Sequence, residues 1–221
     1  MITVHHLNNS RSQRILWLLE ELGLPYEIKR YERDAKTMLA PKELRQVHPL
    51  GKSPVITDGD NTLAESGAII EYLIEKHGNG RFVPAAGTPE RERYRMWMHY
   101  AEGSAMTPLL MKLILSRIPK AAPAIIRPLI NATMNRAIAG FVQPQINQHM
   151  AYWEDALGKS EWFAGNEFTA ADIQMSFPLE AAAARAGGDG HPKIAAFLQR
   201  IHARPAYTRA IERGGPYALM R

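Results

Sequence analysis

The spacing of apolar residues changes once along the chain, and this change limits the folds open to it. Over roughly the first 78 residues, segments with the alternation of strands are interleaved with segments of helical period. After residue 89, apolar residues recur only at helical spacing. The stretch between them, GNGRFVPAAGTP (78–89), has no periodicity and is rich in Gly and Pro. We predict an α/β domain over 1–78, a linker, and an all-α domain over 89–221.

The predicted order of the first domain is strand, helix, strand, helix, strand, strand, helix. We expect strands at 2–7, 26–31, 53–57 and 62–65, and helices ending at Gly23 and spanning 41–47 and 67–77. In the second domain we expect helices over 90–119, 123–157, 170–187, 193–203 and 205–213. Thr169 and Asp172 precede an apolar run, and their spacing predicts a capping box at the start of the helix over 170–187.

Composition excludes several kinds of chemistry. The 221 residues include no cysteine, which rules out disulfides, thiolate metal sites and a catalytic thiol of the protein itself. Any thiol in the reaction must then come from a ligand. The net charge of +5 is spread over many short segments, so we expect no nucleic-acid partner. We see neither a secretory signal nor an apolar run of about 20 residues, so we expect an intracellular protein without a membrane partner.

Two short motifs in the first domain indicate a binding site. Pro54 begins an apolar strand, where it can simply mark a strand edge, or form a cis bond that turns the backbone of Ser53 toward an extended ligand. Glu65 and Ser66 stand at a helix start, where free N–H groups and the helix dipole favour a carboxylate, although Ser66 can also serve only as a cap. Together the two motifs can hold a small peptide that carries carboxylates.

These features resemble the cytosolic glutathione transferases. The resemblance is carried by the order of elements, by GKSPV (51–55), by ESGAI (65–69) and by the helical second half. The stretch SRSQRILWLLEELGLPYE (10–27) is most similar to a bacterial and fungal group with yeast members. The resemblance implies a thioredoxin-like domain that binds glutathione through Ser53 and Pro54 and through Glu65 and Ser66, with Lys52 near the glycine carboxylate. It also implies a cytoplasmic homodimer whose helical domain lines a site for a hydrophobic electrophile.

The first strand–helix turn, LNNSRS (7–12), must activate the thiol of glutathione. Members of the family use Tyr, Ser or Cys at this turn, and the usual catalytic position falls on Asn9, with Ser10 next to it. Ser10 also begins a possible capping box with Gln13. The donor to the sulfur is therefore left open between Ser10, Asn9, Ser12 and the backbone.

The second substrate and the reaction are less constrained by the sequence. Tyr100 and Ser104 lie one turn apart on the helix that lines the electrophile site in the family, so we expect them in that site. His5 and His6 alternate along a strand and face opposite sides, which argues against a shared metal. We predict conjugation of the thiolate to an electrophilic carbon, without a metal. The alternatives are glutathione-dependent reduction of disulfides or peroxides, and a non-catalytic binding protein.

Overall fold

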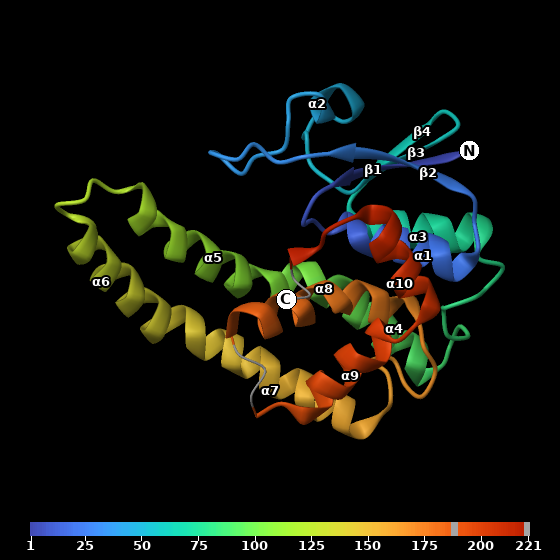
Figure 1. Cartoon of the computed structure of the whole chain (residues 1–221). Helices are drawn as coiled ribbons and strands as arrows, with labels where there is room; N and C mark the ends of the chain where they lie inside the picture. The colour runs from blue at the N-terminus through green and yellow to red at the C-terminus, as the bar shows by residue number, and fades with distance from the viewer. Residues whose placement is uncertain (187–189, 219–221) are drawn as a thin grey trace.

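The computed structural model describes residues 1–186 and 190–218, and the architecture changes along the chain where the sequence predicts (Figure 1). The first part contains β1 (Ile2–Leu7), α1 (Ser12–Leu22), β2 (Tyr26–Tyr31), α2 (Leu44–Val47), β3 (Val55–Asp58), β4 (Asn61–Ala64) and α3 (Ser66–His77). This is the predicted order. None of the helices in the described ranges is both long enough and apolar enough to cross a membrane.

The four strands form one mixed sheet in the order β2-β1-β3-β4. β1 runs parallel to β2 and antiparallel to β3, and β3 pairs antiparallel with β4. Helices α1 and α3 cover one face of this sheet (Figure 1), and Gly23 ends α1 in the left-handed conformation at φ 69°. This sheet with its helices is a thioredoxin-like fold.

The rest of the described chain is helical, and two of its predicted long helices are interrupted. The helix expected over 90–119 consists of α4 (Pro89–Tyr100), the π-helical turn η1 (Ala101–Ala105) and α5 (Met106–Ala121). The helix expected over 123–157 consists of α6 (Arg127–Ala137), the π-helical turn η2 (Ile138–Val142) and α7 (Gln143–Lys159). A π turn is a single wider turn inside a longer helix, and the apolar residues on each side of it keep helical spacing among themselves, so the sequence pattern indicated helix throughout.

The last three helices are α8 (Ala170–Ala186), α9 (Pro192–His202) and α10 (Pro205–Gly214). The predicted end of α8 at Gly187 lies outside the described residues, as does the end of the second domain at 219–221. α5 and α6 form a hairpin that extends away from the other helices (Figure 1).

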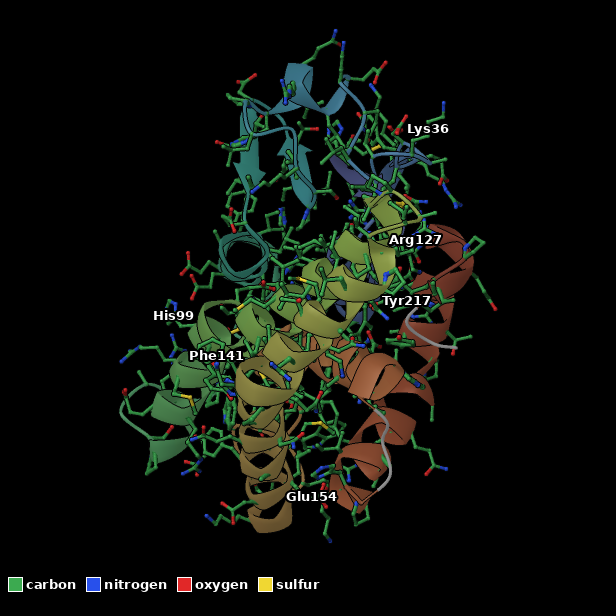
Figure 2. All side chains as sticks on the ribbon, turned by 90° about the vertical axis from the view of Figure 1, so that its left-hand side faces the viewer. Lys36, His99, Arg127, Phe141, Glu154 and Tyr217 are labelled. Atoms are coloured by element: carbon green, nitrogen blue, oxygen red, sulfur yellow. The ribbon has the colours of Figure 1, made fainter. Side chains whose placement is uncertain are left out.

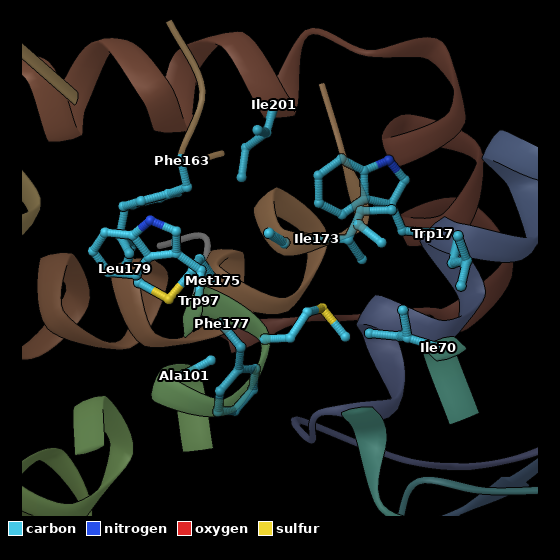
Figure 3. Packing of buried hydrophobic residues seen from close by; sticks show 14 of the residues in the cluster. Trp17, Ile70, Trp97, Ala101, Phe163, Ile173, Met175, Phe177, Leu179 and Ile201 are labelled. Atoms are coloured by element: carbon cyan, nitrogen blue, oxygen red, sulfur yellow. The ribbon is translucent and has the colours of Figure 1, made fainter. Parts of the chain in front are cut away.

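A single hydrophobic core joins the sheet part to the helical part. Figure 3 shows buried residues of α8, among them Ile173, Met175 and Phe177, between Trp17 and Ile70 on one side and Trp97 on the other. Trp17, Ile70 and Ile173 have no exposed surface. Because the two parts share this core, the residues at their junction are held in fixed relative positions.

The start of α8 is capped by Thr169 and Asp172 in a variant of the predicted capping box. The Asp172 carboxylate accepts the N–H of Thr169 at 2.8 Å, as predicted, and also the N–H of Phe163 at 2.9 Å. The Thr169 hydroxyl accepts the N–H of Ala171 at 3.3 Å instead of the expected N–H of Asp172. Burial raises the pKa of Asp172 to about 7, and the hydrogen bonds from these N–H groups oppose that increase.

We expect Asp172→Ala to lower the free energy of unfolding by about 2–4 kcal/mol, because the change removes a cap and leaves two buried N–H groups unpaired. Asp155 provides the matched control. Its exposed carboxylate on α7 pairs only with Lys159, so Asp155→Ala should cost less than about 0.5 kcal/mol. Urea denaturation of both variants measures the difference, and equal midpoints would show that the Asp172 cap contributes little.

Candidate functional site

A cavity of about 260 Å³ lies where the sheet meets the helical part, and the predicted glutathione residues line it together. These are Lys52, Ser53, Pro54, Glu65 and Ser66. The cavity is also lined by Arg11, His48, Leu50, Ala64, Glu102 and Leu110. The sequence therefore predicted one wall of this cavity and missed the wall formed by Arg11, which precedes α1, and by η1 and α5.

The loop before β3 has the predicted geometry. The Ser53–Pro54 peptide bond is cis. The Ser53 hydroxyl donates to the carbonyl oxygen of His5 at 2.9 Å and accepts the N–H of Leu7 at 3.3 Å. These two hydrogen bonds attach the loop to the end of β1. The Ser53 side chain therefore stabilises the fold, and Ser53 also lines the cavity.

The start of α3 is strained at Glu65 and buried at Ser66. Glu65 has φ 71° and ψ 123°, a conformation that a non-glycine residue adopts only where the surrounding structure enforces it. Glu65 occupies the N-cap position, so Ser66 is the first helical residue and not the cap. Ser66 is 3% exposed, and its oxygen accepts an N–H of Arg14 at 2.9 Å. Because Arg14 supplies that proton, the hydroxyl proton of Ser66 remains available to a ligand.

Arg14 is a buried charge at the junction of the two parts. Its guanidinium donates to the carbonyl oxygen of Gln174 at 2.6 Å and to the carboxylate of Glu102 at 2.5 Å. Arg11 donates to the other carboxylate oxygen of Glu102 at 2.7 Å. Although burial acts in the opposite direction, the charges of Arg14 and Arg11 lower the pKa of Glu102 below its ordinary value. Glu102 is therefore ionised at neutral pH and neutralises Arg14.

One feature of the sequence indicates this cluster. Arg14 stands one turn before Leu18 and next to Ile15, on a helix whose other residues in that stretch are apolar. A buried arginine needs an acidic partner, which indicates that a distant carboxylate must reach it. The partner itself, 88 residues away, could not be identified by spacing.

Ser10 at the first turn is buried in a network of hydroxyl groups. Its oxygen lies 2.7 Å from that of Ser12 and 3.4 Å from that of Ser53, and it accepts the N–H of Ser12 at 3.3 Å. The Ser12 hydroxyl in turn lies 2.8 Å from Nδ1 of His6. The possible capping box with Gln13 does not form, since α1 begins at Ser12 and the side-chain N and O of Gln13 have no partner among the described residues.

The protonation of His6 sets the direction of these hydrogen bonds. Burial and the charge of Arg30 lower the pKa of His6 to about 4, so the ring is neutral and carries one N–H. The backbone of Gly214 acts to raise this pKa, and we assign the N–H to the ring nitrogen that does not face Ser12. Nδ1 then accepts the proton of Ser12, and the oxygen of Ser12 accepts the proton of Ser10. The hydroxyl proton of Ser10 is consequently used inside the protein.

Asn9 is exposed at the same turn and has a free donor. It adopts the left-handed conformation at φ 50°, which asparagine tolerates better than most residues. Its Oδ1 accepts the N–H of Ala218 at 2.7 Å, and its Nδ2 has no hydrogen-bond partner in the described part of the chain.

Asn9 lines a second cavity of about 450 Å³ beside the first. The residues around it are Asn9, Arg11, Arg33, Met38, Met106, Leu110, Leu113, Arg117, Phe177 and Ala218. Arg11 and Leu110 line both cavities. The two cavities are therefore adjacent, with the first turn at one side.

Tyr100 and Ser104, which the sequence placed at the electrophile site, are not among the residues that line either cavity. The Tyr100 hydroxyl forms a short hydrogen bond with Nδ1 of His149 and accepts the indole N–H of Trp153 at 3.1 Å. Burial raises the pKa of Tyr100 to about 12, with a small opposing effect of Trp153. Tyr100 therefore belongs to the packing between α4 and α7, while Ser104 is exposed on η1.

The fold class is a thioredoxin-like unit followed by a helical unit, with two adjacent cavities at their junction. Comparison with known families agrees with this class. The model of the glutathione S-transferase N-terminal domain matches residues 1–75, and that of the C-terminal domain matches residues 125–209.

Individual proteins give the same result. Glutathione S-transferase 3 of Schizosaccharomyces pombe is 39% identical over 183 residues, which cover 82% of this chain and 74% of that protein. Glutathione S-transferase 1 of Saccharomyces cerevisiae is 31% identical over 223 residues, covering 96% and 95%. A crystal structure of a glutathione S-transferase from Actinobacillus pleuropneumoniae is 34% identical with a TM-score of 0.80, covering 100% of this chain and 96% of that one. The chain belongs to the glutathione S-transferase family of enzymes, in its fungal type.

We expect Glu102→Gln to lower the free energy of unfolding by about 2–4 kcal/mol at neutral pH, because Arg14 then stays buried without an anion. The folded-state pKa of Glu102 is lowered, so its contribution is complete above the ordinary glutamate pKa of about 4.3 and is lost as the pH falls through the lower folded value. The difference between wild type and variant should therefore shrink in acid.

The matched control is Glu92→Gln, since Glu92 forms an exposed pair with Arg95 on α4. Its effect should stay below about 0.5 kcal/mol at every pH. Denaturation curves at a series of pH values measure both variants. A Glu102→Gln effect that is small, or that does not depend on pH, would contradict the role given to this carboxylate.

Proposed function

We propose that this enzyme binds glutathione in the first cavity and transfers its sulfur to an electrophile held in the second. The observation that carries the proposal is the adjacency of the two cavities, which share Arg11 and Leu110 and meet near the first turn. In this proposal, residues 1–78 bind glutathione, and residues 89–221 contribute most of the electrophile cavity. A solved relative, the transferase URE2P6 of Phanerochaete chrysosporium, was crystallised with oxidised glutathione.

Ser66 and Glu65 are the proposed anchors of the γ-glutamyl end. Ser66 can donate its free hydroxyl proton to a carboxylate that also faces the N-terminus of α3, where the helix dipole favours negative charge. The exposed carboxylate of Glu65 can accept an ammonium group. Lys52 and His48, which line the same cavity, are the proposed partners of the glycine carboxylate. The backbone of Ser53, before the cis proline, is the proposed partner of the cysteinyl segment.

Asn9 is the proposed donor to the sulfur. A thiol with a pKa near about 8.5 is only a few per cent ionised at neutral pH, and a hydrogen bond to the thiolate lowers that pKa. Asn9 borders the second cavity and its Nδ2 has no partner in the described part of the chain, whereas the Ser10 hydroxyl has those of Ser12 and Ser53 within hydrogen-bond distance. The thiolate then attacks an electrophilic carbon. One S–C bond forms, and the leaving group departs with its electron pair.

Family membership supports a cytoplasmic homodimer that removes reactive compounds, and we include both in the proposal. Light scattering of the purified protein tests the oligomeric state. Reduction of disulfides remains the alternative reaction. Because the protein has no cysteine, it would need a second glutathione to release oxidised glutathione. Assays of conjugation and of reduction on the same preparation separate these reactions from each other and from simple binding.

For anchoring, we expect Ser66→Ala to weaken glutathione binding about 10- to 100-fold, through loss of a hydrogen bond to a charged group worth about 1.5–3 kcal/mol. Ser116→Ala is the matched control, because Ser116 is an exposed helical serine of α5 whose hydroxyl donates only to the carbonyl of Leu113. Calorimetric titration of both folded variants measures the affinity. Equal affinities of the two variants for glutathione would mean that Ser66 only accepts the hydrogen bond from Arg14 and does not contact glutathione.

For activation, we expect Asn9→Gly to raise the pKa of the bound thiol by about one unit and to slow conjugation at neutral pH about tenfold. Glycine keeps the positive φ of this position, so the change removes the donor without straining the turn. Asn79→Gly, at φ 48° in the segment after α3, is the control for the backbone effect.

Ultraviolet absorbance of bound thiolate against pH measures the thiol pKa in these variants and in Ser10→Ala. A shift in Ser10→Ala without one in Asn9→Gly would identify Ser10 as the donor. If neither variant shifts the titration, the backbone N–H groups at the start of α1 become the remaining donors.

A further inference from the structure

The second cavity combines an apolar interior with positive charge. Its apolar side chains come from the loop after β2 and from α5 and α8, and they are Met38, Met106, Leu110, Leu113 and Phe177. Figure 1 shows the loop after β2 and α5 on the same side of the molecule, and Figure 2 views that side, with Lys36 of the loop and Arg127 of α6 labelled. An apolar body of a small molecule can fill such a space.

Three arginines line the same cavity, and they differ in their partners. Arg11 pairs at 2.7 Å with Glu102, the carboxylate that also neutralises Arg14. Arg33 donates to the carbonyl oxygens of Asn8 at 3.3 Å and Met38 at 3.1 Å, which fix its position but carry no net charge. Arg117 is exposed on α5, and within residues 1–186 and 190–218 neither it nor Arg33 forms an ion pair with a carboxylate.

The charges of these arginines act on one another. Burial, followed by repulsion from Arg11 and Arg117, lowers the pKa of Arg33. The carboxylate of Asp34, the residue next to Arg33, accepts the N–H groups of Lys36 and Thr37 in its own turn and forms no ion pair with Arg33 in the described structure. Arg33 and Arg117 therefore line the same cavity, and neither has a carboxylate partner among the described residues.

We propose that the electrophile accepted by this enzyme is an amphipathic anion, with its apolar, reactive part against Phe177 and Met106 and a carboxylate or sulfonate between Arg33 and Arg117. This inference rests on the proposed function and adds the class of the second substrate. An anion at this place offsets the positive charges of Arg33 and Arg117. Its oxygens also accept pairs of parallel N–H hydrogen bonds, because the planar guanidinium group holds its donors in a fixed geometry. The reaction is unchanged: the thiolate forms the S–C bond and the leaving group departs as an anion.

The carboxylates of glutathione itself are the other possible source of negative charge. Their proposed partners, Ser66 and Lys52, line the first cavity, whereas Arg33 and Arg117 line only the second. The two sources therefore predict different results when the arginines are changed. Loss of an electrophile contact affects the anionic electrophile, and loss of a glutathione contact affects every reaction through the KM for glutathione.

The test uses two aryl halides of nearly equal shape, neutral chlorodinitrobenzene and anionic chlorodinitrobenzoate, each corrected for its uncatalysed rate with glutathione. The measured quantity is the ratio of kcat/KM for the anionic compound to that for the neutral one. We expect Arg33→Gln and Arg117→Gln each to lower this ratio about 3- to 10-fold, since both contacts are partly open to solvent. The ratio for wild type should also fall as salt is added.

Arg95→Gln is the control for net charge, because Arg95 is an exposed arginine of α4 paired with Glu92. It should leave both activities unchanged. An unchanged ratio in Arg33→Gln and Arg117→Gln would overturn the inference, and so would a raised KM for glutathione with both electrophiles.

A binding measurement separates this inference from the proposed function. Calorimetry on the two preformed glutathione conjugates compares their affinities without any turnover. Tighter binding of the carboxylate conjugate, lost in Arg33→Gln and Arg117→Gln, supports the anionic site even if neither halide is conjugated. Failure of conjugation alone would then count against the proposed reaction, and equal affinities of the two conjugates would overturn the anionic site.

Discussion

The ion pair between Arg14 and Glu102 connects the two halves of this enzyme, and the rest of the site depends on it. Arg14 is 1% exposed, and its guanidinium contacts α3 through Ser66, α8 through Gln174 and η1 through Glu102. A buried guanidinium without its carboxylate would cost several kcal/mol. The packing of α1, α3 and α8 is therefore compatible with only one position of η1, and that position forms a wall of the first cavity.

The ion pair between Arg14 and Glu102 also affects two residues of the proposed substrate sites, Ser66 and Arg11. Arg14 satisfies the oxygen of Ser66 and leaves its proton for a ligand, so a residue of the fold determines which hydrogen bond a substrate can receive. Glu102 also holds Arg11, whose side chain lines both cavities and is stacked over Phe177 at 5.2 Å. One carboxylate from the helical part thus positions the boundary between the two proposed substrate sites.

Local features of the site could be predicted from the sequence, while contacts across the domains could not. The strand at 2–7, the cis bond before Pro54 and the left-handed Gly23 follow from short-range rules and are present. Asn9 and Ser10 could not be separated by sequence, because the choice depends on which way the hydroxyl network of Ser12 and His6 is directed. The sequence placed Tyr100 at the electrophile site, but helical spacing does not reveal whether a face meets a cavity or another helix. In the structure its hydroxyl contacts His149 and Trp153 of α7.

We propose that the sulfur of glutathione lies at the first turn, between an anchoring cavity and an electrophile cavity. A crystal structure of the enzyme with an S-alkyl glutathione tests this position. We expect the γ-glutamyl carboxylate at Ser66, the sulfur within hydrogen-bond distance of Nδ2 of Asn9, and the alkyl group against Met106 and Phe177. A sulfur that lies away from Asn9, or an alkyl group that leaves the second cavity for solvent, would contradict it.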